Sequence, residues 1–345
     1  MMKHSKFLGA AALLLIGIGI GAASGYIEGK ANSTSLVNSI NQSLSPIEEG
    51  GTSYTFVRPL IAYRTPEAVL LGDYVSLKNS VQSIIDSATS SGTASRVSFY
   101  FRDLDAARWI GINQNDTYYP ASLLKVPAMI AFYKEAEDNG LSVLSQTVVY
   151  DPSVVPKDPF TSPSGLVGER EYSIQKLIDS MIVDSDNGAT YTLLNHINPD
   201  LLHAVYVALG IQDPGDDSTN YMISSRTYGL FFRILYNATY LSPAYSEKAL
   251  KLLSKATFVD GLVAGVPEGT VVAHKYGDHV LSSGGTVTGV ELSDCGIVYY
   301  PAHPYLLCVM TAAANTSTAS SIIANISRAT YSAVAEKYAT TSPAL

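Results

Sequence analysis

The spacing of hydrophobic residues along this chain changes from alternating to helical and then back to alternating. Val97, Phe99 and Phe101 occupy every second position of the stretch 95–104, which predicts a strand with one buried face. From Ser122 onward the pattern changes to helical, and it begins with a continuous apolar run after Lys125 that is typical of a buried helix. The whole pattern predicts a helix at 74–88, strands at 95–104 and 107–112, helices at 122–138, 173–185, 188–196, 199–209, 226–241 and 243–255, strands at 270–275, 285–290, 294–300 and 305–312, and a last helix at about 317–337.

The order of these elements is strands, a block of helices, strands again, and a final helix, with no internal repeat. Such an order predicts an antiparallel sheet that is built from both ends of the chain, with a helical subdomain inserted between its strands. We therefore expect an α/β fold of the α+β sandwich type.

The N-terminus predicts where the protein is located. Lys3 and Lys6 precede an uncharged run from Phe7 to Ile27, which is long enough to cross a bilayer as a helix. Positive charge before the run places that end in the cytoplasm and the rest outside it. We expect a membrane anchor at 1–28, with a cleaved signal peptide and a secreted protein as the alternative.

The residues after the anchor divide into two parts. The stretch 29–53 is rich in Ser and Asn and has no aromatic residue from Asn32 onward, which is typical of a flexible linker. The stretch 54–345 carries the periodic pattern and is expected to be one folded domain.

Composition excludes several kinds of partner. The formal net charge is −8 and Lys and Arg do not cluster, which argues against binding to nucleic acid. The six histidines include no H-E-x-x-H motif, and the two cysteines are too few for a cysteine-based metal site. We therefore expect neither a metal nor another cofactor.

Cys295 and Cys308 lie on two predicted strands that are joined by a short turn between Pro301 and Pro304. A two-residue loop at Ala302–His303 would place the cysteines on one face but one diagonal step apart, which is somewhat too far for a disulfide. A small shift in register would bring them opposite each other. A disulfide and two buried free thiols therefore remain alternatives.

Ser122 and Lys125 form the candidate reactive pair. Residues three apart on a helix share one face, so the amine of Lys125 can reach the hydroxyl of Ser122. A Lys among apolar residues loses its charge more easily than one in water and can then act as the base that activates a serine. The same spacing recurs at Ser173 and Lys176, where Ser173 is expected to be an ordinary helix N-cap.

Two further short motifs distinguish Ser122 from Ser173. Ser185-Asp186-Asn187 and then Lys275-Tyr276-Gly277 follow Ser122-Leu123-Leu124-Lys125 along the chain. In this order they resemble the S-x-x-K, S-D-N and K-T-G signatures of the penicillin-recognising serine enzymes, and most closely those of the class A β-lactamases. The resemblance covers roughly residues 95–335 and implies a β-lactamase/transpeptidase-like fold, with a five-stranded antiparallel sheet flanked by helices and an inserted all-α subdomain.

The resemblance also implies a role for each motif residue. Ser122 would attack the carbonyl carbon of a β-lactam or of a D-Ala-D-Ala-type stem peptide of peptidoglycan, and Lys125 would take its proton or help to. Ser185 would pass a proton to the departing nitrogen, while Asn187 and Lys275 would bind the substrate amide and carboxylate. Tyr276, Gly277 and Asp278 would line the substrate site, with the backbone N–H groups of Ser122 and Asp278 as the oxyanion hole.

The chain departs from the family at three places, one of which is Asp278, an acidic side chain beside the expected oxyanion hole. Tyr276 replaces a small hydroxyl residue that binds the substrate carboxylate, so this hydroxyl is expected to be displaced or screened. The E-x-x-L-N motif, whose Glu activates the deacylating water, is missing, because only Glu247 and Glu268 occur between Gly188 and His274. A class A-like β-lactamase, a cell-wall D,D-peptidase or transpeptidase, and a slowly deacylating penicillin-binding sensor therefore remain alternative functions.

Overall fold

The computed structural model describes residues 45–48, 54–64, 74–152, 164–215 and 220–339. The chain divides into two compact units, and of the first (Met1–Ser45 with Tyr63–Leu70) only Ser45, Tyr63 and Arg64 are described. The second unit, Pro46–Ala62 with Leu71–Leu345, contains all three sequence motifs. The central sheet and the helices on both of its faces all belong to this second unit.

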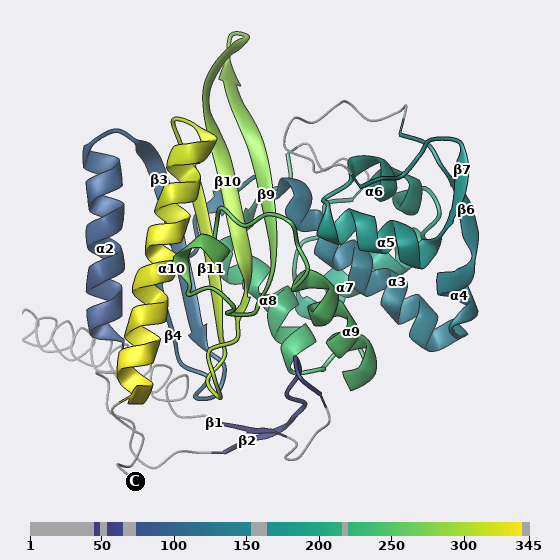
Figure 1. Ribbon diagram of the computed structural model, residues 1–345, viewed down its shortest axis with the longest axis horizontal. Helices are drawn as coiled ribbons and strands as arrows, with labels where there is room; N and C mark the ends of the chain where they lie inside the picture. Colours follow the sequence, from purple (N-terminus) through teal and green to yellow (C-terminus); the bar gives the residue numbers. More distant parts are fainter. Residues whose placement is uncertain (1–44, 49–53, 65–73, 153–163, 216–219, 340–345) are drawn as a thin grey trace, which may run out of the picture. The chain divides into compact units, whose positions relative to one another are not determined.

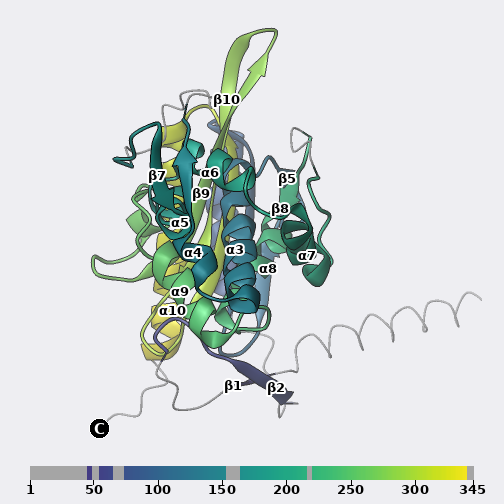
Figure 2. The same ribbon diagram turned by 90° about the vertical axis from the view of Figure 1, so that its right-hand side faces the viewer.

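In the part of the chain that the structure describes, five strands form one antiparallel sheet in the order β4-β3-β11-β10-β9 (Figure 1). They are β3 (Ala94–Asp103), β4 (Trp109–Ile112), β9 (Val272–Ser283), β10 (Thr286–Val298) and β11 (Tyr305–Ala313). Strands from before the helical block thus pair with strands from after it, and the predicted antiparallel five-stranded sheet is confirmed. Figure 2 shows that the hairpin of β9 and β10 extends beyond the other strands.

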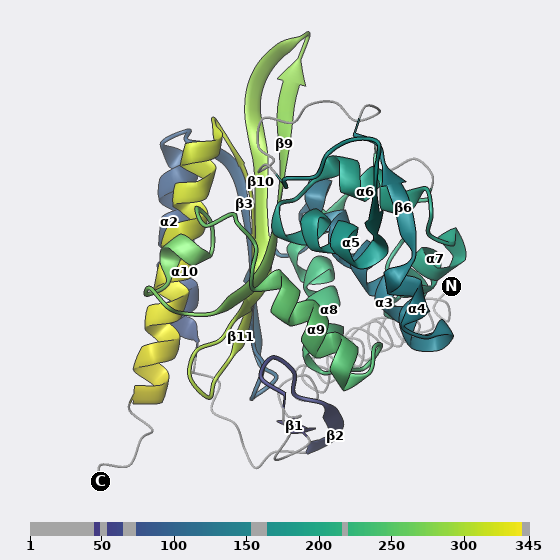
Figure 3. The same ribbon diagram turned by 45° about the vertical axis from the view of Figure 1, so that its right-hand side comes forward.

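Two helices cover one face of the sheet. Helices α2 (Val75–Ser90) and α10 (Thr316–Ala339) lie side by side there (Figures 1 and 3). Val81 from α2 and Ile323 from α10 are fully buried and share a core with Phe99 of β3. A helix from before β3 and the helix after β11 therefore form the layer on this face of the sheet.

The helical block covers the opposite face (Figure 3). It contains α3 (Lys125–Asn139), α4 (Ser142–Ser145), α5 (Ile174–Val183), α6 (Asn187–Leu194), α7 (Pro199–Leu209), α8 (Ser225–Tyr236) and α9 (Pro243–Leu253). Short strands and turns connect these helices to each other and to the sheet: β5 (Thr117–Tyr118) with β8 (Ile223–Ser224), β6 (Thr147–Tyr150) with β7 (Arg170–Ser173), and the 3₁₀ turns η1 (Ala121–Leu124) and η2 (Val263–Gly265). Before α2, β1 (Ser45–Glu48) and β2 (Leu60–Arg64) form a separate two-stranded pair.

Helix α3 lies at the centre of the helical block. Every residue from Lys125 to Tyr133 is buried, because this part of the helix is apolar on all sides apart from Lys125 itself. A Lys at the start of such a helix must find its polar partners inside the protein. The position of α3 therefore brings Lys125 into the interior next to η1.

Strand β10 corrects the sequence prediction of two strands at 285–290 and 294–300. It runs without interruption from Thr286 to Val298, with a bulge near Gly289. The polar residues Glu291 and Asp294 lie within this strand, where both are buried and each is bound by a partner, Asp294 by His274 (2.7 Å). Buried polar residues that are hydrogen-bonded do not interrupt a strand.

The predicted helix over 226–241 is also too long. Helix α8 ends at Tyr236, and the backbone of Ala238 is in the left-handed region (φ 49°), which cannot continue a right-handed helix. Apolar residues beyond the helix end had extended the pattern to Leu241, which is buried in the core without being helical.

The register of β10 on β11 decides the state of the two cysteines. Cys295 and Cys308 lie directly opposite each other with Cα atoms 4.0 Å apart, and they form a disulfide. The two-residue loop predicted at Ala302–His303 is wrong, because the strands already end at Val298 and begin again at Tyr305. The wider connection moves the register by one diagonal step, which brings the sulfur atoms together.

The predicted anchor at 1–28 lies outside the described residues, as does most of the predicted linker at 29–53. Residues 45–48 of that linker form strand β1 and are therefore paired backbone. Among the described residues, no helix is both long and apolar enough to cross a membrane.

Candidate active site

Ser122 lies in η1, the short turn that joins β5 to α3. The residue before it, Ala121, has a φ of 46°, in the left-handed region that a residue with a Cβ atom rarely adopts. Such a conformation persists only where surrounding contacts impose it. The backbone at Ser122 is therefore held by its neighbours more than by its own preferences.

Ser185 joins the three motifs at one point. Its Oγ lies 3.1 Å from Ser122 Oγ, 3.0 Å from Lys125 Nζ and 2.9 Å from Lys275 Nζ. Ser185 is buried between α5 and α6, and its backbone also has a left-handed φ of 57°. Because the two amines donate to this hydroxyl, its single proton is directed to Ser122.

Lys125 is held by acceptors on the S-D-N segment. Its Nζ donates to the backbone oxygen of Ser185 (2.6 Å), to Ser185 Oγ (3.0 Å) and to Asn187 Oδ1 (2.7 Å). Three acceptors match the three hydrogens of an ammonium group. Ser185 and Asn187 thus fix the amine of Lys125 beside the serine hydroxyls. Asp186, which lies between them, caps α6 by accepting from the backbone N–H of Ala189 (2.7 Å).

Lys275 is fully buried on β9. Its Nζ donates to Ser185 Oγ and to the backbone oxygen of Tyr276 (3.1 Å). Burial lowers the pKa of Lys275 well below its usual value, and the charge of Lys125 lowers it further. This amine therefore gives up a proton more readily than a lysine in water.

Gly277 brings β9 into contact with the nucleophile turn. A Cβ atom at this position would lie 2.5 Å from the backbone oxygen of Pro120 and 3.1 Å from the backbone nitrogen of Leu123. Neither backbone atom can move aside easily, so the K-Y-G motif requires a residue without a side chain here. Asp278 is the next residue of the strand, opposite Leu292 of β10.

Tyr276 does not take the place of the hydroxyl residue that its position in the motif suggests. Its ring is buried and stacks on Phe258, with ring centroids 4.2 Å apart, in the core that faces α10. Lys275 Nζ lies 4.2 Å from the centroid of the same ring, a cation–π contact. Tyr276 thus contributes its ring and its backbone oxygen to the surroundings of Lys275.

Several contacts that hold the motifs in place were not predicted from the sequence. The hydroxyl of Tyr150 donates to Asp186 (3.2 Å), and Ser164 also binds this carboxylate. The hydroxyl of Tyr228 donates to the backbone oxygen of Leu123 (2.9 Å). These residues belong to no short motif, so only the folded chain identifies them.

A family model described as "Beta-lactamase enzyme family" matches residues 76–334, which is most of the chain and contains all three motifs. The chain belongs to this β-lactamase family. Its membership confirms the predicted kinship with the penicillin-recognising serine enzymes.

Solved structures share the β-lactamase fold at low sequence identity. PBP-A matches with a TM-score of 0.64 and 22% identity, over 75% of this chain and 97% of that one. A β-lactamase from Chitinophaga pinensis matches with a TM-score of 0.64 and 20% identity, over 75% and 99% of the two chains. A class A β-lactamase from Mycobacterium abscessus matches with a TM-score of 0.62 and 17% identity, over 75% and 99%. No curated protein matches the sequence.

The two glutamates between the S-D-N and K-Y-G motifs of this β-lactamase-family chain are Glu247 and Glu268, and each is a candidate base for deacylation. The carboxylate of Glu247 accepts from the backbone N–H groups of Thr55 (2.9 Å), Phe56 (2.6 Å) and Val57 (3.1 Å). It therefore anchors the N-terminal segment of the domain. Glu268 lies in the turn before β9.

The stretch after α7 carries three aspartates, Asp213, Asp216 and Asp217, between the S-D-N and K-Y-G motifs. Asp213 binds Nδ1 of His203 (2.5 Å) and accepts from the backbone N–H of Gly215 (2.9 Å), so hydrogen bonds hold its carboxylate in place. Asp216 and Asp217 lie outside the described residues.

Proposed function

We propose that this chain is a serine acyl-transfer enzyme that forms an acyl-enzyme at Ser122 with β-lactams or with D-Ala-D-Ala-type peptides. The observation that carries the proposal is the position of Ser185 Oγ, within hydrogen-bond distance of Ser122, Lys125 and Lys275 at once. A serine next to a buried amine network has a route by which its proton can leave. PBP-A, one of the structural neighbours, has been solved as a mutant in an acyl-enzyme complex with penicillin-G.

In the proposed reaction, Ser122 Oγ bonds to the substrate carbonyl carbon and the carbon–nitrogen bond breaks. The unprotonated amine of Lys125 takes the proton of Ser122. Ser185 delivers its own proton to the departing nitrogen and takes one back from Lys125, to which it is hydrogen-bonded (3.0 Å). Lys275 supports this transfer by donating a hydrogen bond to Ser185 Oγ (2.9 Å), which keeps the hydroxyl proton of Ser185 directed toward the reacting groups. The backbone N–H groups of Ser122 and Asp278 stabilise the oxyanion, while Asn187 and Lys275 bind the substrate amide and carboxylate.

Two finer alternatives depend on the fate of the acyl group. A class A-like β-lactamase hydrolyses it rapidly, whereas a D,D-peptidase, a transpeptidase or a penicillin-binding sensor retains it after reaction with penicillin. The carboxylate of Glu247 is occupied by the backbone N–H groups of residues 55–57, so it is not available as a base for deacylation. This favours a D,D-peptidase, a transpeptidase or a penicillin-binding sensor.

The experiment that tests the proposal is incubation of the pure protein with a reporter penicillin, followed by intact-mass measurement. A mass increase of one penicillin on Ser122 supports acyl transfer, and rapid multiple turnover identifies a β-lactamase. Release of D-alanine from a D-Ala-D-Ala peptide then separates a peptidase from a sensor. A protein that forms no adduct and turns over neither substrate contradicts the proposal.

We also infer that the domain is displayed outside the cytoplasm, held at the membrane by residues 1–28. The buried disulfide between Cys295 and Cys308 supports this, because such bonds persist in oxidising compartments. Recovery of the full-length chain in the soluble cytoplasmic fraction would contradict the proposed location.

A further inference from the structure

Glu291 is a buried carboxylate outside the three motifs. It lies on β10, is 3% exposed, and accepts from the backbone N–H of Tyr119 at 2.9 Å. Its other oxygen forms an ion pair with Arg96 of β3. Because Tyr119 is three residues before Ser122, this contact links the sheet to the nucleophile turn.

The ion pair crosses the strand that lies between its two partners. Glu291 is opposite Ala312 of β11, and Ala312 is opposite Arg96 of β3, so the three residues form one row across the sheet. Strands are about 4.8 Å apart, and only long side chains can meet across an intervening one. The small side chain of Ala312 leaves the space in which Arg96 and Glu291 meet.

Arg96 holds the same segment at two more points. Its Nη1 donates to the backbone oxygen of Thr117 (2.9 Å), and its guanidinium lies 4.3 Å from the ring centroid of Tyr118. Together with Glu291, it therefore fixes three consecutive residues, 117 to 119. The chain then enters Pro120 and the left-handed backbone of Ala121.

We propose that Glu291, supported by Arg96, is a positioning residue that imposes the backbone conformation of the nucleophile turn. The turn is fixed after Ser122 by the hydrogen bond from Tyr228 to Leu123 and is packed against Gly277 at Pro120. Glu291 supplies the fixed point before Ser122. Its effect on reaction rate rests on the acyl transfer proposed above, whereas its effect on the turn does not.

The test compares two substitutions of Glu291 with a matched substitution elsewhere in the sheet. Glu291→Leu removes both contacts, whereas Glu291→Gln keeps a carbonyl oxygen for the N–H of Tyr119 and leaves Arg96, which is 39% exposed, free to turn to water. Asp103→Asn is the control, because Asp103 is also a buried carboxylate of this sheet. It lies seven positions from Arg96 along β3, roughly 23 Å away in an extended strand.

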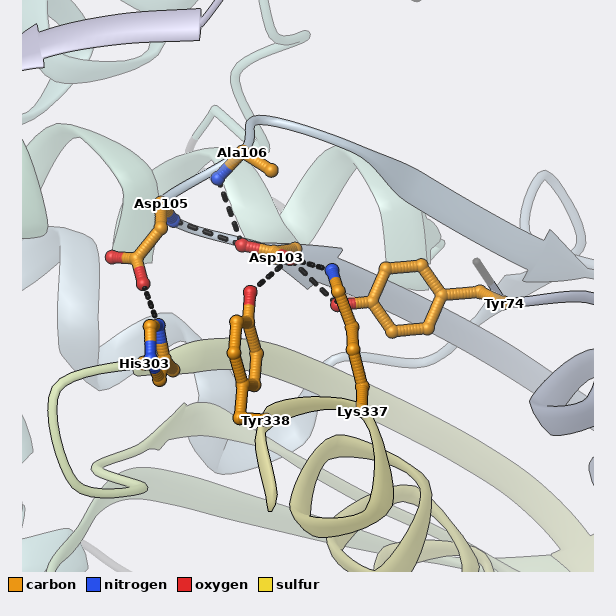
Figure 4. Close-up of polar contacts among 7 residues, drawn as sticks. All are labelled: Tyr74, Asp103, Asp105, Ala106, His303, Lys337 and Tyr338. Atoms are coloured by element: carbon orange, nitrogen blue, oxygen red, sulfur yellow. Dashed lines mark hydrogen bonds and ion pairs between the residues drawn. The ribbon is translucent and has the colours of Figure 1, made fainter. Parts of the chain in front are cut away.

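Figure 4 shows why Asp103 makes a suitable control. Its carboxylate accepts from the hydroxyl groups of Tyr74 (2.6 Å) and Tyr338 (2.9 Å), from Lys337 Nζ (3.0 Å), and from two backbone N–H groups. Substitution to Asn therefore lowers stability without touching the nucleophile turn.

Two quantities are measured for each variant: the rate of acylation by the reporter penicillin at saturation, and the hydrogen-exchange rate of the Tyr119 amide. We expect Glu291→Leu to slow acylation by roughly 10- to 100-fold, the cost of misplacing a reacting group by up to an ångström, and to speed exchange at Tyr119. Glu291→Gln should have an acylation rate and a Tyr119 exchange rate close to those of the wild type. Asp103→Asn should lower Tm and change neither.

Three results would overturn the proposal. These are wild-type acylation by folded Glu291→Leu, unchanged exchange at Tyr119, and equal slowing by Asp103→Asn at matched loss of Tm. If the wild type forms no adduct, the proposed function fails by itself. The exchange measurement then still decides whether Glu291 holds the turn.

Discussion

Lys275 shows at the scale of one residue how a reactive site conflicts with stability. It is fully buried beside Lys125, and its pKa is lowered because the interior disfavours its charge. Between this lowered pKa and the usual value of about 10.5, the unfolded chain binds a proton that the folded chain does not. The free energy of unfolding therefore rises with pH across that window. Lys275 destabilises the folded protein most at pH values below the lowered pKa.

We predict that Lys275→Met stabilises the protein while impairing acylation. At pH 7 the gain should be on the order of 1 kcal/mol, or about 2–4 °C in Tm, and it should shrink as the pH approaches 10. Urea unfolding at both pH values measures the difference. A variant that is less stable than the wild type at pH 7 would show that the hydrogen bonds of Lys275 outweigh its burial.

Ser122 and Ser173 allow a second test at this scale, because both start an S-x-x-K sequence. Ser173 caps α5 by accepting from the backbone N–H of Lys176 (3.2 Å), whereas Ser122 bonds to Ser185. We expect Ser122→Ala to abolish the penicillin adduct. Ser173→Ala should keep the adduct and lose about 1 kcal/mol of stability, as is usual for a lost N-cap. An adduct that survives in Ser122→Ala contradicts the assigned nucleophile.

The motif residues could be predicted from the sequence because each motif spans only three or four positions. Glu291 could not be predicted, since it alternates with Val290 and Leu292 like a residue on the exposed face of a strand. Its partner Arg96 is 195 positions away in the sequence, and only the paired register of β3, β11 and β10 brings the two together.

At the scale of elements, the disulfide joins two neighbouring strands of the central sheet. Cys295 and Cys308 are 13 positions apart, and both are fully buried. Closing a loop of this size is worth about 3 kcal/mol through the entropy of the unfolded chain.

We therefore predict no titratable thiol in denatured, unreduced protein, and two after reduction. Cys295→Ala together with Cys308→Ala should lower the free energy of unfolding by about 2–4 kcal/mol. Thiol counting with a chromogenic reagent is the measurement. Two free thiols before reduction would show that β10 and β11 pair without a disulfide between Cys295 and Cys308.

The element boundaries show what periodicity could and could not predict. The order of strands and helices followed from the pattern, because each long element is amphipathic or uniformly apolar. The pairing of Cys295 with Cys308 did not, because a strand register depends on where a connecting turn begins. The turn at Tyr300–His303, with the N–H of His303 bonded to the oxygen of Tyr300 (3.0 Å), is set by the folded chain.

At the scale of the whole molecule, the fate of the acyl group depends on whether a base activates the water that would hydrolyse it. General-base assistance typically contributes roughly 10²–10⁴-fold to such a step. Glu247 is bound to three backbone N–H groups, and Asp213 is bound to His203. We therefore predict that a penicillin adduct on Ser122 persists for minutes or longer.

The lifetime of the adduct is measured by intact mass after removal of excess penicillin. Glu247→Gln serves as a control that should lower stability and leave this lifetime unchanged. Rapid multiple turnover of a reporter cephalosporin would contradict the prediction, and single substitutions of Asp213, Asp216 and Asp217 would then locate the base.

The anchoring of residues 55–58 also determines how the domain responds to mechanical force. Glu247 binds three successive backbone N–H groups, Tyr299 donates to the oxygen of Phe56 (3.0 Å), and the N–H of Arg58 binds the oxygen of Tyr236 (2.8 Å). These bonds fasten the segment to α9, to the end of α8 and to the residue after β10. A pull on the chain at Tyr54 is therefore resisted by these bonds first, so tension is spread over several elements before it reaches the strand that leads to Ser122.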